Sequence, residues 1–303
     1  MLAERRLAGP TLSEEAARVG ADVDALFGRL LAAPGDGRDR LFAAMRHAGI
    51  GGGKRLRPLL TVAAARLFGI DEERALRAGA AVEAIHVYSL IHDDLPCMDD
   101  DDLRRGKPTV HKAFDEATAV LAGDCFHDLA FEILSDVATH EDPFVRADLV
   151  LELARASGPH GMAGGQMFDL VAPGEPLDIG AITRLQQLKT GALIQYSVEA
   201  ACIMGRLTAS ARNPYRGFAR DLGLAFQIAD DLLDHDGDEA AAGKRLNKDA
   251  EAGKATFVSL MGVERARQQC ALLVDQAIAH LQQHGAEADL LRAIARYVHE
   301  RDR

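Results

Sequence analysis

Carboxylates gather in two short stretches of this 303-residue chain. The first, residues 91–107, reads IHDDLPCMDDDDLRRGK and places six aspartates directly before two arginines and a lysine. The second, QIADDLLD over residues 227–234, contains another pair of adjacent aspartates and a third acid. Neighbouring like charges on a buried helix destabilise it unless cations neutralise them. The two stretches therefore predict a cation site, and a solvated acidic surface is the alternative.

The spacing of the acids indicates which of them could share one cation. On a helix Asp230 and Asp234 lie on the same face, because they are four residues apart. In the first stretch the residue four after Asp93 is a cysteine, and Pro96 ends or kinks the helix. A distorted helix end would bring Asp99 back towards Asp93. The three aspartates that follow are then expected to lie in water.

Oxygen ligands on two separate elements are typical of Mg²⁺. This ion binds one or two carboxylates together with waters and phosphate oxygens. Calcium is the competitor, but neither stretch has the spacing of an EF-hand loop. We expect Mg²⁺, with Mn²⁺ as the alternative ion.

Glycines and cations occur between the acidic stretches. GIGGGKRLRP, residues 49–58, is a glycine turn that leads into a helix with Lys54 and Arg57 on one face, which favours an anion. It is not a Walker loop, because Arg55 stands where Ser or Thr is required. Further candidate anion contacts are Arg104, Arg105, Lys189 with Thr190, Lys244 and Lys254. So many cations predict two polyanionic ligands, one bound through Mg²⁺ and one bound directly.

Composition limits the class of protein. Apolar residues make up 48% and charged residues 27%, as in soluble globular proteins. The net charge of −11 argues against nucleic acid or an anionic membrane as the main partner. The scattered cysteines, the missing signal sequence and the missing ~18-residue apolar stretch predict a cytoplasmic protein without stable membrane association.

Apolar residues recur at helical spacing almost throughout, and glycine or proline falls where helices should end. The segments with this pattern are 56–68, 75–95, 117–138, 145–157, 181–206, 215–235 and 263–284. Residues 79–91 and 192–205 are apolar on nearly every side and should be buried inside a ring of other helices. We predict one all-α domain over residues 1–303, a helical bundle around a central cavity.

These stretches together resemble the trans-isoprenyl diphosphate synthases, the head-to-tail prenyltransferases. The motifs that carry the resemblance are GGGKRLRP, IHDDLPCMDDDDLRRGKPT, LAGD, GGQMFDL, LKTGALI, GLAFQIADDLLD and GKATFVSL, in the family's order. The LPCM between the acids resembles bacterial farnesyl and bacterial or plant geranylgeranyl synthases. The family's fold is a bundle of long helices around a deep cavity, with both acidic motifs at its mouth.

The resemblance also implies roles for individual residues. Three Mg²⁺ on an allylic diphosphate would be bound by Asp93, Asp99, Asp230 and Asp234. The same diphosphate would contact Arg104, Lys189, Thr190, Gln227, Lys244 (or Lys248) and Lys254. The catalytic residues among these would be Lys189, Thr190, Gln227 and Arg104. Isopentenyl diphosphate would be bound by Lys54, Arg57, His86 and Arg105.

The implied reaction is ionisation, condensation and elimination. Breaking the allylic C–O bond leaves a carbocation and a diphosphate, which metal ions and cationic side chains stabilise in a water-poor pocket. The double bond of isopentenyl diphosphate attacks the cation, and the proton is lost to the released diphosphate. No protein base is assigned, although His86 and His92 lie near the first motif.

Product length is predicted from Tyr88 and Ser89. Tyr88 precedes Asp93 by five residues, which places it roughly 7.5 Å down the helix at ~1.5 Å per residue. In the family a bulky residue there stops chain growth, so we predict farnesyl diphosphate. Geranylgeranyl or geranyl diphosphate is the alternative product, and an ordinary core role is the alternative for Tyr88.

Two other functions share parts of this pattern. A terpene cyclase has a similar fold but needs one diphosphate site, and a catalytically silent subunit of a heteromeric prenyltransferase tends to lose one acidic motif. The resemblance implies a homodimer, and residues 237–256 are the predicted mobile lid.

Overall fold

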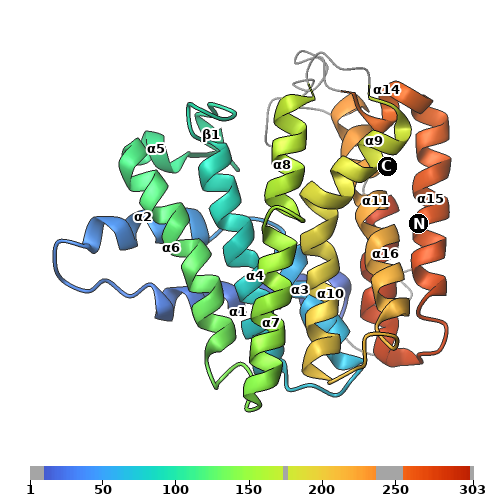
Figure 1. Cartoon of the computed structure of the whole chain (residues 1–303), viewed down its shortest axis with the longest axis horizontal. Helices are drawn as coiled ribbons and strands as arrows, with labels where there is room; N and C mark the ends of the chain where they lie inside the picture. The colour runs from blue at the N-terminus through green and yellow to red at the C-terminus, as the bar shows by residue number, and fades with distance from the viewer. Residues whose placement is uncertain (1–9, 173–176, 237–254, 301–303) are drawn as a thin grey trace.

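The computed structural model describes residues 10–172, 177–236 and 255–300, and these form helices joined by short turns (Figure 1). The first helices are α1 (Leu12–Leu30), α2 (Asp39–Gly49), α3 (Leu56–Arg66), α4 (Glu72–Asp93), α5 (Val110–Ala113) and α6 (Glu116–Ser135). Next come α7 (Pro143–Ser157), α8 (Met162–Val171), α9 (Ile179–Gln186), the π-helical η1 (Gln187–Gly191) and α10 (Ala192–Met204). The last are α11 (Asn213–Asp236), α14 (Phe257–Met261), α15 (Val263–Ala279), the 3₁₀ turn η2 (Ala286–Ala288) and α16 (Asp289–Glu300). The all-α prediction is confirmed.

Three helices form the interior of the bundle. Residues 58–65 of α3, 78–85 of α4 and 193–204 of α10 are all buried, apart from Gln195. The prediction that residues 79–91 and 192–205 lie inside is therefore confirmed over most of their length. α4 packs against α3 and α6, and α10 packs against α3 and α7. Many of these buried side chains are alanines, so the helix backbones approach one another closely.

Helices lie in every predicted segment, although α15 ends at Ala279 rather than at residue 284, and two further differences occur. The segment predicted as one helix over 181–206 is divided into α9, η1 and α10. A two-stranded ribbon, which the sequence did not predict, follows α4: β1 (Leu103–Arg104) pairs antiparallel with β2 (Lys107–Pro108). Two of the places where glycine or proline predicts a helix end, residues 173–176 and Gly237, lie outside the described residues.

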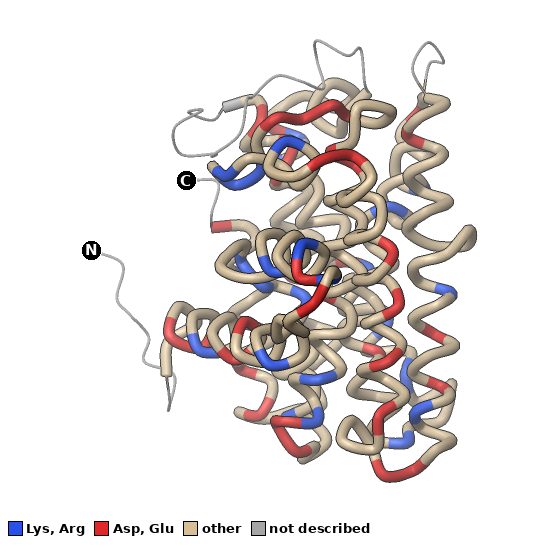
Figure 2. The backbone as a smooth tube through the Cα atoms, turned by 90° about the vertical axis from the view of Figure 1, so that its left-hand side faces the viewer, with Lys and Arg blue, Asp and Glu red and all other residues tan. Residues whose placement is uncertain are grey.

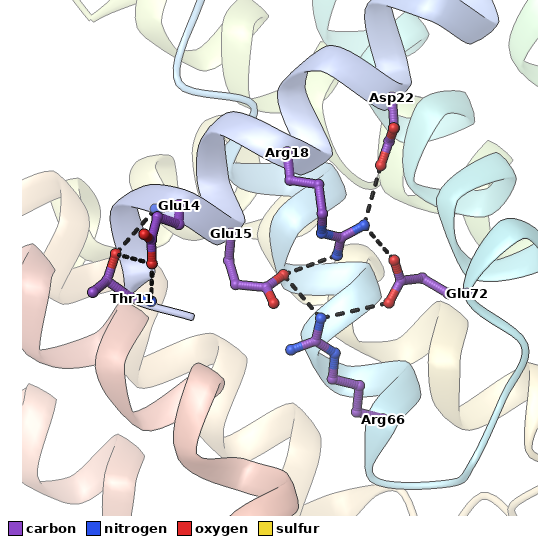
Figure 3. Close-up of polar contacts among 7 residues, drawn as sticks. All are labelled: Thr11, Glu14, Glu15, Arg18, Asp22, Arg66 and Glu72. Atoms are coloured by element: carbon purple, nitrogen blue, oxygen red, sulfur yellow. Dashed lines mark hydrogen bonds and ion pairs between the residues drawn. The ribbon is translucent and has the colours of Figure 1, made fainter. Parts of the chain in front are cut away.

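A capping box and an ion-pair network hold α1 in place (Figure 3). Thr11 accepts a hydrogen bond from the backbone N–H of Glu14, whose carboxylate accepts one from the N–H of Thr11. Glu15 is buried and pairs with Arg18 at 2.8 Å and with Arg66 of α3 at 2.9 Å. The other carboxylates of the network are Asp22 and Glu72. These contacts hold α1 against the end of α3 and the start of α4.

Charged segments of the described chain are interspersed in the view of Figure 2, with acidic and basic positions on the same helices. Among the described residues, no helix combines the length and the apolar character needed to cross a membrane.

The close approach of α3 and α4 gives a stability prediction. A Cβ at Gly79 would lie 2.8 Å from the Cα of Pro58, so Gly79→Ala should force the helices apart and cost about 1–3 kcal/mol of unfolding free energy. Gly28→Ala in α1 is the control, because a Cβ there meets nothing within 4 Å. It should be neutral or stabilising by up to ~1 kcal/mol, since alanine favours helix. Equal urea midpoints for the two variants would contradict this packing.

Candidate active site

The first acidic stretch forms the end of α4 and the loop after it. α4 ends at Asp93, and the backbone N–H of Asp99 donates to the Asp93 carbonyl at 2.8 Å. The N–H of Asp100 donates to the Leu95 carbonyl at 3.2 Å, and Asp100 has left-handed backbone, with φ 50°. The chain thus turns back at Pro96 and brings Asp99 beside Asp93, as the proline and the spacing predict.

The pKa of Asp93 at this helix end is raised above its usual value. Burial raises this pKa to about 6, and the nearby charge of Asp99 adds to the rise, whereas Lys189 and Arg104 oppose it. A carboxylate that is half-buried beside another acid is stabilised by an added cation. The oxygen donors here therefore fit a divalent metal ion.

The second acidic stretch lies on α11. Asp230 and Asp234 are partly buried, and the charge of Asp230 acts on Arg57 at the start of α3. Asp231 is buried instead; it accepts hydrogen bonds from the Phe257 N–H at 2.8 Å and from Gln227 Nε2 at 3.3 Å. Asp231 therefore joins α11 to α14 and fixes the Gln227 amide.

No three His, Cys, Asp or Glu side chains in the described part of the chain lie close enough to form a metal site by themselves. Mg²⁺ does not require such a cage, because it takes few protein carboxylates and completes its shell with water and phosphate oxygens. The donor set of the two stretches, which is oxygen only, fits this ion.

The ribbon after the first stretch separates two arginines. Its two-residue turn has Arg105 at φ 54° and Gly106 at φ 75°, which is the backbone of a type I′ hairpin. Arg104 stands in β1 and pairs with Asp94 and Asp101, whereas the guanidinium of Arg105 lies against Gly53. Strands of two residues are too short to show an alternating pattern, so the sequence did not predict the ribbon, although the family resemblance assigned the two arginines to different diphosphates.

Arg57, His86 and Arg105 form a cationic group between α3, α4 and the ribbon. Burial lowers the pKa of Arg57, which Glu83 opposes and Arg105 reinforces. Burial and the charges of Arg57 and Arg105 hold the pKa of His86 well below its usual range, so this imidazole is neutral at pH 7. Among the described residues, the buried Nε of Arg57 has no hydrogen-bond partner. These three predicted residues come together, and Lys54, just before α3, is exposed.

Arg55 holds the glycine turn in place, because its guanidinium donates a hydrogen bond to the Gly49 carbonyl. It has left-handed backbone, with φ 46°, and its side chain is buried. The guanidinium pairs with Glu83 of α4 at 2.8 Å and with Asp24 of α1 at 2.6 Å. The Arg55 side chain is therefore buried against α1 and α4, and its charge still acts on His86 and Arg105. The sequence did not identify Glu83 or Asp24, because an ion pair between distant helices leaves no local pattern.

The π-helical segment η1 carries Lys189 and Thr190. Lys189 Nζ donates to Asp169 of α8 at 2.7 Å, and Thr190 Oγ1 donates to the side-chain oxygen of Gln227 at 3.2 Å. The close approach of α8 depends on Gly165, where a Cβ would lie 2.2 Å from the Lys189 nitrogen. Asp169 was missed, although it is the acid within the quoted GGQMFDL. π-Helical turns are frequent at functional sites.

Tyr88 and Ser89 lie on α4 below Asp93. The ring of Tyr88 meets the rings of His92 and His127 edge to face, at centroid distances of 5.6 and 5.3 Å. Ser89 Oγ donates to the His86 carbonyl at 2.9 Å, within its own helix. His92 Nε2 hydrogen-bonds to the Val120 carbonyl at 3.1 Å. Tyr88 is thus braced by α6, which the sequence could not show.

Lys244, Lys248 and Lys254 lie outside the described residues, as does the predicted lid up to residue 254. The site as described is built at one end of the molecule, where Figure 1 shows β1, α8, α9 and α14.

Paired acids that face cations at one end of an all-α bundle define an isoprenoid synthase fold. The family model described as polyprenyl synthetase matches residues 38–297. The chain belongs to this family and is a prenyltransferase.

Individual relatives agree with this assignment. Farnesyl diphosphate synthase of Escherichia coli (strain K12) is 44% identical over 267 residues, which are 86% of this chain and 88% of the relative. The crystal structure of an FPP/GFPP synthase from Zymomonas mobilis is 58% identical, with a TM-score of 0.88, and the match covers 95% of this chain and 98% of that one. A geranyltransferase from Helicobacter pylori, complexed with magnesium and isoprenyl diphosphate, is 28% identical with a TM-score of 0.85, over 98% and 100% of the two chains.

The glycine turn gives a prediction about anion binding. A Cβ at Gly53 would lie 2.4–2.6 Å from the guanidinium atoms of Arg105 and must displace it. Gly53→Ala should therefore weaken the binding of inorganic diphosphate in EDTA about tenfold, since one charge-assisted hydrogen bond is lost. Calorimetric titration measures this.

Gly51→Ala is the matched control for this measurement. Gly51 has φ 74° and Gly53 has φ 81°, so both substitutions carry the same backbone strain, but a Cβ at Gly51 meets only Lys107 Nζ, at 3.5 Å. Equal weakening in both variants would show that backbone strain, rather than the position of Arg105, determines binding.

Proposed function

We propose that the chain condenses isopentenyl diphosphate with dimethylallyl and then geranyl diphosphate to give farnesyl diphosphate. The observation that carries this proposal is the separation of the cations into two groups. Arg104 and Lys189 lie with the acids Asp93 and Asp169, whereas Arg57 and Arg105 lie with neutral His86, on which the charge of Arg104 acts less strongly than theirs. Two groups of this kind suit two diphosphates bound side by side, which a terpene cyclase does not need.

The allylic diphosphate would bind at the group that contains Asp93, Arg104 and Lys189. Mg²⁺, when bound, supplies positive charge that stabilises the departing diphosphate. The residues that would hold this ion are Asp93, Asp99, Asp230 and Asp234. We propose three ions per site, with Mn²⁺ as the alternative to Mg²⁺. Arg104 and Lys189 would bind the diphosphate oxygens directly, and the Lys244 and Lys254 contacts remain part of the proposal. The amide of Gln227 is held by Thr190 and Asp231, so its dipole would be fixed beside the reacting carbon.

Isopentenyl diphosphate belongs to the cationic group. Arg57 offers a buried N–H donor without a described partner, and Arg105 and Lys54 add positive charge. Because His86 is neutral, it can donate one hydrogen bond to the diphosphate without titrating near pH 7. These contacts to the diphosphate would orient the double bond of isopentenyl diphosphate towards the allylic carbon.

No protein group acts as the base in this proposal. His92 Nε2 is hydrogen-bonded to the Val120 carbonyl of α6, and His86 would contact the diphosphate of isopentenyl diphosphate. When the new C–C bond forms, the proton leaves the adjacent carbon of the former isopentenyl unit. The released diphosphate accepts that proton.

We also propose one domain and a homodimer. A single apolar core runs from Val19 in α1 to Val298 in α16, which supports one domain over residues 1–303. Large apolar side chains are exposed on α6 and α7, which pack together. These side chains are Val120, Leu121, Phe144 and Leu151, and Phe144 is 80% exposed. A second copy that covers them would remove this apolar surface from water.

Product analysis tests the function. The purified chain with isopentenyl diphosphate and Mg²⁺ is given dimethylallyl, geranyl or farnesyl diphosphate separately. We expect farnesyl diphosphate from the first two and no extension of the third. Extension of farnesyl diphosphate would favour a longer product, as the relative described as an FPP/GFPP synthase suggests. If isopentenyl diphosphate is not consumed, the chain is a cyclase or a silent subunit.

Tyr88→Ala extends this test to product length. Removing the ring should open the cavity below Asp93, so the variant should make products longer than those of the wild type. Tyr88→Phe is the control, because it keeps the ring that packs on His92 and His127. Chromatography of the dephosphorylated products gives the answer. If the longest product of Tyr88→Ala is no longer than that of the wild type, Tyr88 is not the floor.

A further inference from the structure

Asp94 directly follows Asp93 but lies in a different environment. Successive helical residues point about 100° apart, so the two carboxylates diverge. Asp94 is only 3% exposed, and its Oδ1 accepts hydrogen bonds from both Nε and Nη2 of Arg104, the first at 2.9 Å. Asp101 accepts a longer bond from the same Nη2, at 3.3 Å. Asp94 is therefore the nearest counterion of Arg104.

The backbone of Asp94 also holds the loop that carries Arg104. Its carbonyl accepts a hydrogen bond from the Asp101 N–H at 3.3 Å. The Asp101 carbonyl accepts one from Thr109 Oγ1 at 2.8 Å, and the strand pairing of Arg104 with Lys107 closes the loop. Both the backbone and the guanidinium of Arg104 are thus held in position before any ligand binds.

A guanidinium held in this way still has donors for a ligand. Arginine has five N–H groups. Asp94 and Asp101 bind the Nε and Nη2 side, and among the described residues nothing hydrogen-bonds to Nη1. Holding a long side chain in its bound geometry reduces the conformational entropy lost when a ligand binds.

We propose that Asp94 is a positioning residue, which holds Arg104 for the allylic diphosphate, and that it is not a metal ligand. This inference rests on the proposed function, because that function assigns Arg104 to the allylic diphosphate. A divalent ion on the bound oxygen of Asp94 would face the guanidinium at close range, and the two cations would repel each other. The two adjacent acids thus have different surroundings, with Asp93 near Asp99 and Lys189 and Asp94 hydrogen-bonded to Arg104.

The test compares Asp94→Asn with Asp93→Asn. Asparagine keeps the shape of Asp94 but loses the charge that holds Arg104. We expect the KM for the allylic substrate to rise about tenfold, as for one charge-assisted hydrogen bond. The KM for isopentenyl diphosphate and the Mg²⁺ concentration at half-maximal rate should stay within about twofold. Asp93→Asn should raise the Mg²⁺ requirement instead.

A double-variant cycle with Arg104→Met shows whether Asp94 acts through Arg104. Once Arg104 is gone, Asp94→Asn should cause no further rise in the allylic KM, because coupled residues are not additive. Asp94→Glu retains the charge and should recover part of the affinity. Calorimetric binding of inorganic diphosphate with Mg²⁺ repeats the comparison without turnover.

Three results would overturn the proposal: an Mg²⁺ requirement raised as much by Asp94→Asn as by Asp93→Asn, additive effects in the cycle, or an equal rise in both substrate KM values. An Asp94→Glu variant no better than Asp94→Asn would do the same if the asparagine variant folds poorly. A wild type that never consumes isopentenyl diphosphate would refute the proposed function instead, and the diphosphate titrations would still report on Asp94.

Discussion

Two diphosphates carry too much negative charge to lie side by side unless each has its own cations. Under the proposed function, the divergence of the adjacent residues Arg104 and Arg105 meets that constraint. The left-handed residues Arg105 and Gly106 form the I′ turn, which leaves Arg104 in a strand and places Arg105 beside the glycine turn. Each arginine then lies with a different group of side chains. Most of the remaining site geometry supports this separation.

Backbone strain gathers at the same place. Four described residues other than glycine have positive φ, and three of them, Arg55, Asp100 and Arg105, lie in the loops that form the site. Such conformations cost roughly 1–2 kcal/mol per residue and persist where the surroundings determine them. Buried ion pairs do so for Arg55, through Glu83 and Asp24. The bundle interior of α3, α4 and α10 provides the rigid frame.

Much of the fold could be predicted from the sequence because helical periodicity is a local signal. The apolar residues of 192–205 predicted the buried α10, and Pro96 predicted the return of Asp99 to Asp93. The two-residue strands left no pattern, and the π-helical η1 keeps an apolar spacing close to that of an α-helix. Carboxylates that hold cations, such as Asp94, Glu83 and Asp169, could not be assigned, because their partners come from other elements. The sequence therefore suggested which cations could bind anions, but it did not indicate which carboxylates orient those cations.

The separation of Arg104 from Arg105 is tested most directly by steady-state kinetics of Arg104→Lys and Arg105→Lys, with each substrate varied in turn. Lysine keeps the charge but loses the planar, forked donors that bind phosphate oxygens. The account predicts that Arg104→Lys raises mainly the KM for the allylic diphosphate and Arg105→Lys mainly the KM for isopentenyl diphosphate, each about tenfold. If both variants raise the same KM, the two arginines serve one diphosphate and the account is wrong.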